Sequence, residues 1–334
     1  MKRKNFIKIG LLLALLFPLG ACAKDGSQPK EDKNQGQESN PVVVTSTDIL
    51  YDFTRAIAKD AVTVKGLMAG VVDAHHWEPK PADMQLLHDA SLLVINGAHL
   101  EHWLEEIQPS LPKDLTILDS SEHLDLIKVK EEAEDSDHDQ KNDNHEHADH
   151  DDHDDHDHHH GGVDPHVWTS PKQAKKQAET IYQGLCQRFP EKGKVFDQGW
   201  AQLSKKFDTL IKKYDQALQG ASGKGMIVPH LAFSYLARDY GLNQQGLQGL
   251  LADGQLSAER VKEIIDFAQK EKLHTIFYDA YGDKGEAMRL AQEMRAEALP
   301  LYTLESISET DRKQGADYFT LMEKNLQSLV NSFQ

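Results

Sequence analysis

The amino-acid sequence predicts an α/β protein with two lobes, each built on a parallel sheet that is flanked by helices. Short stretches of β-branched residues alternate with helical patterns of apolar residues, which favours parallel βαβ units. About 290 residues follow a polar N-terminal region, which is long for a single core. A long amphipathic pattern over residues 190–219 separates the two sets of alternating segments and predicts one helix of about seven turns.

The N-terminus has the pattern of an export signal. Basic MKRKNFIK precedes the apolar run GLLLALLFPLG, which is shorter than the ~20 residues of a membrane-spanning helix. Leu19-Gly20-Ala21-Cys22 resembles the bacterial lipobox, so we expect Cys22 to carry a lipid, an ordinary signal peptide being the alternative. Residues 23–40 are polar and predict a flexible tether. The expected location is extracytoplasmic, on the bacterial cell membrane.

In the first lobe, strands are predicted at 41–46, 62–67 and 91–97, with helices between them. His75 lies just past the second strand, in a loop of the kind that binds ligands in parallel sheets. The adjacent His76 would point elsewhere if the backbone is extended. His99 and His102 have helical spacing, but a solvated amphipathic helix explains them better than a metal site.

In the second lobe, a strand at 226–228 ends at His230, the same topological position as that of His75. Two further strands are predicted at 275–279 and 300–304. Asp279 would end the first of these strands, and Glu305 would end the second.

Within the first lobe the chain carries a low-complexity loop at 131–162, with fourteen Asp and Glu against one Lys. It cannot bury a core, so we expect it to be disordered. Imidazole and carboxylate at this density favour borderline divalent metals such as Zn²⁺. The loop holds nine of the 18 histidines: His138, His145, His147, His150, His153, His156, His158, His159 and His160. A functionless solvated insert is the alternative.

Three segments together resemble a known family. DAHHWEPKPADM, NGAHLEHWL and DPHVWTSP are similar to the metal-binding substrate-binding proteins of bacterial ABC importers, specifically the zinc group. The resemblance covers roughly residues 41–334. It implies that His75 and His166 are metal ligands, that His230 in HLAFSYLA is the third, and that Glu305 is the fourth, with Asp279 in reserve. Ala74 stands where the family usually has Pro.

The resemblance also implies a function. The long helix would cross between the lobes and limit their relative motion, and the bound Zn²⁺ would be delivered to an ABC permease and its ATPase without catalysis. The protein would act as a monomer, and the histidines of the loop would be accessory. The boundaries expected on this basis are a lipoprotein signal peptide at 1–22, a tether at 23–40, lobes at 41–189 and 220–334, and a rigid connecting helix at 190–219.

Two other classes of function remain. A secreted zinc hydrolase would use three ligands and a water, but the chain has no HExxH motif and no serine nucleophile elbow. A manganese-binding or adhesin lipoprotein of the same family would fit the anchor, although three histidines favour zinc over manganese. The net charge of −17 without a basic stripe argues against nucleic-acid binding.

Overall fold

The computed structural model describes residues 40–68, 70, 73–129, 162–252 and 256–334. The predicted signal peptide, Cys22, the tether and the nine loop histidines from His138 to His160 lie outside the described residues. Among the described residues, no helix combines the length and the apolar character needed to cross a membrane.

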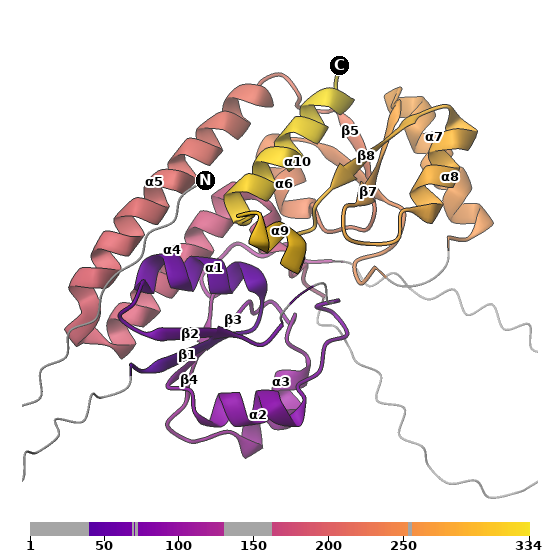
Figure 1. Cartoon of the computed structure of the whole chain (residues 1–334). Coiled ribbons are helices and arrows are strands. Elements are labelled where there is room, and N and C mark those ends of the chain that lie inside the picture. Colours follow the sequence, from indigo (N-terminus) through magenta and orange to yellow (C-terminus); the bar gives the residue numbers. More distant parts are fainter. Residues whose placement is uncertain (1–39, 69, 71–72, 130–161, 253–255) are drawn as a thin grey trace, which may run out of the picture. The chain divides into compact units, whose positions relative to one another are not determined.

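The first sheet has four parallel strands in the order β2-β1-β3-β4. Figure 1 shows helix α1 on one side of this sheet and helices α2 and α3 on the other. Three of the strands were predicted, whereas β4 was not, because its TILD sequence is short and gives no clear pattern. The elements are β1 (Val42–Thr45), α1 (Asp48–Ala58), β2 (Thr63–Gly66), α2 (Pro81–His88), β3 (Leu92–Ile95), α3 (Trp103–Ile107) and β4 (Thr116–Asp119).

The second sheet repeats this topology, in the order β6-β5-β7-β8 and again all parallel. Strand β6 was not predicted, because its sequence NQQG has no apolar side chain. The two sheets with their helices confirm the predicted fold class (Figure 1). The elements are β5 (Gly225–Val228), α6 (Ser234–Tyr240), β6 (Asn243–Gly246), α7 (Ala258–Glu271), β7 (Thr275–Asp279), α8 (Gly285–Met294) and β8 (Glu297–Leu301).

The last strand differs from its prediction. The predicted strand at 300–304 is wrong, because β8 pairs along the whole of β7, from Thr275 opposite Glu297 to Asp279 opposite Leu301. Beyond the strand, Leu304 has φ +62°, a left-handed conformation that ends an extended chain. Glu305 therefore lies in the loop that follows β8 and not at the end of the strand.

The segment around His99 also differs from its prediction. Helix α3 begins only at Trp103, so His99 is not on its face. The preceding turn has positive φ at Gly97, Ala98 and His99. The buried Glu101 carboxylate stabilises this turn, since it accepts hydrogen bonds from the backbone N–H groups of Asn96 (2.8 Å) and Gly97 (3.0 Å).

The predicted long helix is confirmed as α5 (Gly193–Ala217), preceded by a 3-10 turn at Pro190–Lys192. It packs beside α4 (Pro171–Arg188) and contacts both α1 and α10 (Tyr318–Ser332). Its apolar face meets theirs in an aromatic cluster, where the ring centroids of Phe53, Phe207 and Tyr318 are 5.0–5.7 Å apart. One apolar core thus joins helices from both ends of the chain.

The crossing of α5 over α1 requires a glycine, which gives a stability prediction. A Cβ atom at Gly199 would lie 2.1 Å from the backbone oxygen of Ile57. We expect Gly199→Ala to lower the free energy of unfolding by about 1–3 kcal/mol through overpacking. Gly193→Ala, at the open start of α5, is the matched control and should be neutral or stabilising by up to ~1 kcal/mol. Urea denaturation measures both, and equal effects would contradict the prediction.

Candidate metal centre

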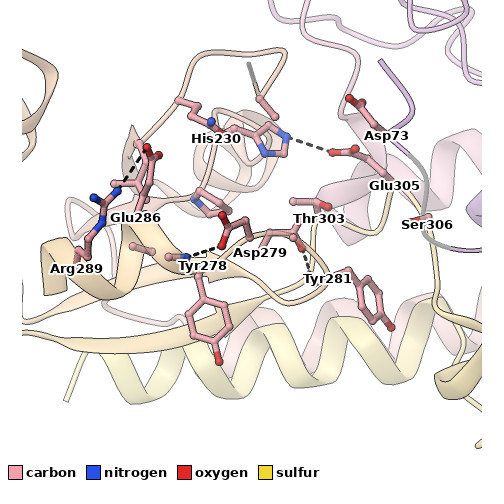
Figure 2. Close-up of a pocket in the computed structure, with 18 residues that line it drawn as sticks. Asp73, His230, Tyr278, Asp279, Tyr281, Glu286, Arg289, Thr303, Glu305 and Ser306 are labelled. Carbon is pink, nitrogen blue, oxygen red and sulfur yellow. Dashed lines mark hydrogen bonds and ion pairs between the residues drawn. The ribbon is translucent and has the colours of Figure 1, made fainter. Parts of the chain in front are cut away.

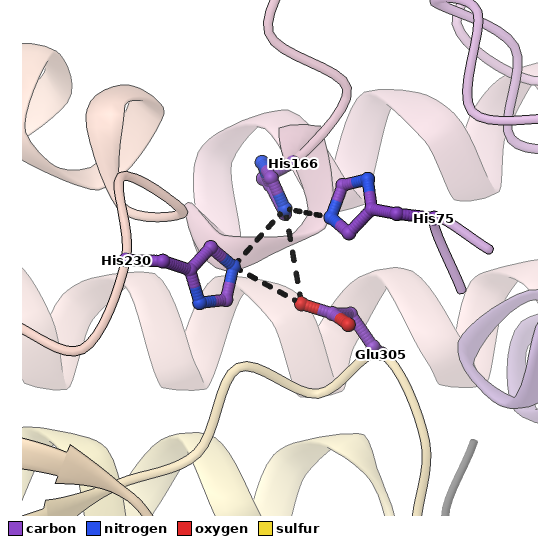
Figure 3. A group of neighbouring side chains, drawn as sticks. All are labelled: His75, His166, His230 and Glu305. Atoms are coloured by element: carbon purple, nitrogen blue, oxygen red, sulfur yellow. Dashed lines mark hydrogen bonds and ion pairs between the residues drawn. The ribbon is translucent and has the colours of Figure 1, made fainter. Parts of the chain in front are cut away.

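The structure brings four of the predicted side chains together. One ligand atom from each of His75, His166, His230 and Glu305 lies within 4.8 Å of the others (Figure 3). The Nε2 atom of His166 is 3.0 Å from that of His75 and 3.4 Å from that of His230, and the Glu305 Oε1 atom is 3.2 Å from the His230 Nε2. In the described part of the chain, this is the one group of this kind.

The four side chains come from four separate loops. His75 follows β2, His166 begins the 3-10 turn η2 (Val167–Thr169), His230 follows β5, and Glu305 follows β8. Two of them precede α5 in the chain and two follow it. The convergence agrees with the sequence prediction, whereas the role of each residue as a ligand stays a prediction.

His166 is the central and most buried member of the cluster, with no exposed surface. The Asp164 Oδ1 atom accepts hydrogen bonds of 2.9 Å from the His166 Nδ1 and from its backbone N–H. Nδ1 is therefore the protonated nitrogen, and Nε2 presents its lone pair to the cluster. Asp164 was not among the predicted site residues, although its place two residues before a candidate ligand histidine is a signal for this role.

The chain that follows His166 is bonded to the loops of the other ligands. The Trp168 Nε1 donates to the backbone oxygen of Thr303 (2.8 Å), close to Glu305. The Thr169 hydroxyl donates to the backbone oxygen of Ala232 (2.9 Å), close to His230. These bonds fix three of the four ligand-bearing loops relative to one another.

The two adjacent histidines after β2 have opposite environments, as predicted. His75 is buried, and its backbone N–H donates to the Asp73 Oδ1 atom (2.9 Å). The side chain of His76 is 57% exposed and pairs with the Asp73 Oδ2 atom at 2.6 Å. Asp73 therefore holds His76 outward while its other oxygen holds the backbone of His75.

The electrostatics of the cluster suit a cation. Burial, reinforced by the charge of His166, lowers the pKa of His75 to about 3, so its imidazole is neutral and free to coordinate. Burial by itself would raise the pKa of Glu305, but the hydrogen bond and charge of His230 and the other imidazoles lower it to about 2. The carboxylate is thus ionised at neutral pH. Burial would lower the pKa of His230, but Glu305 outweighs it and raises that pKa above 6.5.

Three imidazole nitrogens and one carboxylate oxygen form a donor set that zinc prefers. Ligand atoms at ~2.0–2.1 Å from a tetrahedral Zn²⁺ are about 3.3 Å apart. Four of the distances between the ligand atoms of the cluster, those from His166 to the other three residues and from His230 to Glu305, are 3.0–3.8 Å and bracket that value. Asp279, the reserve candidate, is not part of the group but lines a cavity next to it with His230 and Glu305 (Figure 2).

Comparisons with known proteins identify the family of this chain. The family model described as "Zinc-uptake complex component A periplasmic" matches residues 43–332. The zinc-binding lipoprotein AdcA of Streptococcus pneumoniae is 31% identical over 96% of this chain, which spans 60% of the length of AdcA. The high-affinity zinc uptake system protein ZnuA of Bacillus subtilis is 29% identical, and the match covers 98% of both chains.

A solved structure shares the fold. The Zn(II)-bound ZnuA-like domain of Streptococcus pneumoniae AdcA has a TM-score of 0.71 and 28% identity, covering 88% of this chain and 99% of that domain. The relatives are named as zinc-binding and zinc-uptake proteins and not as enzymes, in agreement with the expectation that this protein catalyses no reaction.

The ion pair of His230 with Glu305 gives a prediction for the metal-free protein. Its contribution to stability is present below pH ~6.5 and is lost as the pH rises through the raised pKa of His230. In Glu305→Gln the opposing charge is gone, so burial dominates and the pKa of His230 should fall. Ring-proton NMR titration of His230 measures this, with Glu323→Gln, an exposed partner of Lys213, as the control. A pKa of His230 that is unchanged in Glu305→Gln would contradict the assignment.

Proposed function

The chain belongs to the zinc-uptake complex component A family, and from that premise we propose that it captures Zn²⁺ between two lobes and delivers it to an ABC permease. The lobes are residues 41–189 and 220–334, connected by the helix at 190–219. The protein performs no chemistry on its cargo.

One observation carries the proposal: the buried group of His75, His166, His230 and Glu305. Three histidines favour zinc over manganese, which more often takes extra carboxylates. Four protein ligands complete a tetrahedron, so no position remains for the water that a zinc hydrolase needs. This supports cargo binding over catalysis.

The origin of the ligands links metal capture to lobe closure. His75 and His166 belong to the first lobe, and His230 and Glu305 belong to the second. Only the closed arrangement provides all four donors, so metal binding stabilises closure. Separation of the lobes on the permease would remove two donors at once and release the ion. Helix α5, which packs on α1 and α10, limits this motion to a small one.

The state of the donors favours capture at neutral pH. His75 is neutral and Glu305 is ionised before the metal arrives. His230 holds a proton more tightly than usual, and binding of the ion expels that proton. Zinc affinity should therefore fall on acidification.

The remaining parts of the proposal concern residues outside the described ranges. Cys22 carries the lipid that anchors the protein to the outer face of the cell membrane, near the permease and its ATPase. The nine histidines of the 131–162 loop collect zinc weakly and are dispensable for the fold. The protein acts as a monomer.

Zinc binding can be tested directly on the mature protein. We expect native mass spectrometry to detect one tightly bound Zn²⁺ in a protein lacking residues 135–160. His230→Ala should raise the Kd for Zn²⁺ by more than 10–100-fold, which is the typical loss of affinity when a residue that only hydrogen-bonds to a metal ligand is removed. His88→Ala removes an exposed histidine of α2 and is the matched control. Tighter binding of manganese than of zinc would overturn the metal assignment and favour the manganese-type alternative.

Delivery can be tested in cells. A strain that lacks the gene should grow poorly when zinc is chelated, and the wild-type gene should restore growth and zinc uptake. The His230→Ala gene should restore neither, while His88→Ala should behave as the wild type. Full growth of the deletion strain with unchanged zinc uptake would contradict a role in import.

A further inference from the structure

A cavity of about 740 Å³ lies directly beside the cluster of His75, His166, His230 and Glu305 (Figure 2). His230 and Glu305 form part of its wall, and Asp73, next to the loop of His75, forms another part. The volume is many times the ~30 Å³ that one water molecule occupies in the liquid. The cluster itself is almost closed, since its histidine side chains are at most 4% exposed and that of Glu305 is 11% exposed. The cavity therefore has room for a hydrated ion, whereas the cluster does not.

Asp279 lines the cavity together with His230 and Glu305. It is the last residue of β7, and its charge acts on both Glu305 and His230. Its Oδ1 atom accepts a hydrogen bond from the backbone N–H of Tyr281 (3.0 Å), which holds the carboxylate in the wall. In the described part of the chain, Asp279 forms no ion pair with a Lys, Arg or His side chain within 4.0 Å.

Other carboxylates on the cavity wall are already engaged. Asp73 uses both oxygens, one for the backbone of His75 and one for the His76 ring. Glu286 lies 4.0 Å from the guanidinium of Arg289. Asp283 also lines the cavity, but it is exposed, and its Oδ1 atom accepts a hydrogen bond from the backbone N–H of Gly285 (2.8 Å). Among the carboxylates of the cavity wall outside the cluster, Asp279 is thus the one without an ion pair whose charge acts on both Glu305 and His230.

We propose that this cavity is the route by which the hydrated divalent cation reaches the cluster, and that Asp279 is its staging ligand. The carboxylate binds the cation through oxygen while water still fills most of its coordination shell. The ion then exchanges its remaining water for Glu305 and His230, and it dissociates from Asp279. The inference rests on the proposed function, and it adds a residue that controls the rate of binding rather than the final affinity.

The test is stopped-flow zinc binding to the metal-free protein, with a fluorescent chelator as competitor. In Asp279→Asn we expect the association and dissociation rate constants to fall together by about tenfold, the scale of electrostatic steering, with the Kd within about threefold of wild type. Asp279→Glu should restore the rates. Asp208→Asn makes the same chemical change at an exposed residue of α5 that pairs with Lys175. It should leave both rate constants unchanged.

The salt dependence of the wild-type protein is a second measurement that needs no variant. Added sodium chloride should slow zinc association in the wild type and slow it less in Asp279→Asn, because salt screens the attraction. Wild-type association that is independent of salt would overturn the proposal, and so would an unchanged association rate in Asp279→Asn. Faster dissociation with unchanged association would make Asp279 a final ligand instead. Failure of the wild type to bind zinc would overturn the proposed function itself.

Discussion

The hydrogen bond between Asp164 and His166 is the interaction on which the metal centre depends. It fixes the ring at the middle of the cluster and directs Nε2 at the other three ligands. The same short stretch continues into Trp168 and Thr169, whose side chains are bonded to the loops that carry Glu305 and His230. The polar groups of this stretch thus find partners on both sides of the site, which holds it in one conformation.

The cluster is costly without a cation, because it brings three imidazoles and a carboxylate together out of water. The protein lowers that cost by keeping His75 neutral and by pairing His230 with Glu305. In the proposed function, Zn²⁺ displaces the proton of His230 and is bound by all four donors, which offsets this cost. The adjoining cavity is the proposed route by which the hydrated ion enters.

Most of the fold could be predicted because its strands and helices have strong patterns of their own. Strands β4 and β6 were missed, since neither has a run of apolar residues and each is held at a sheet edge by its neighbour. The predicted start of β8 was three residues too late, because pairing with β7 sets the position of this strand and the apolar pattern of the sequence does not. The helix expected at His99 is absent for a similar reason, since the Glu101 carboxylate accepts hydrogen bonds from the backbone of the turn before α3.

The sequence by itself predicted the parallel α/β class and the long helix, because their segments have strong local periodicity. It predicted the four residues of the candidate site through the resemblance of the segments around them to a zinc-binding family. The tertiary structure alone decided that these side chains meet and that Asp279 borders a cavity beside the site instead of joining it. The meeting of the four side chains depends on contacts between residues 64 to 230 positions apart in the chain. No local pattern encodes such distances, since packing of the whole core sets them.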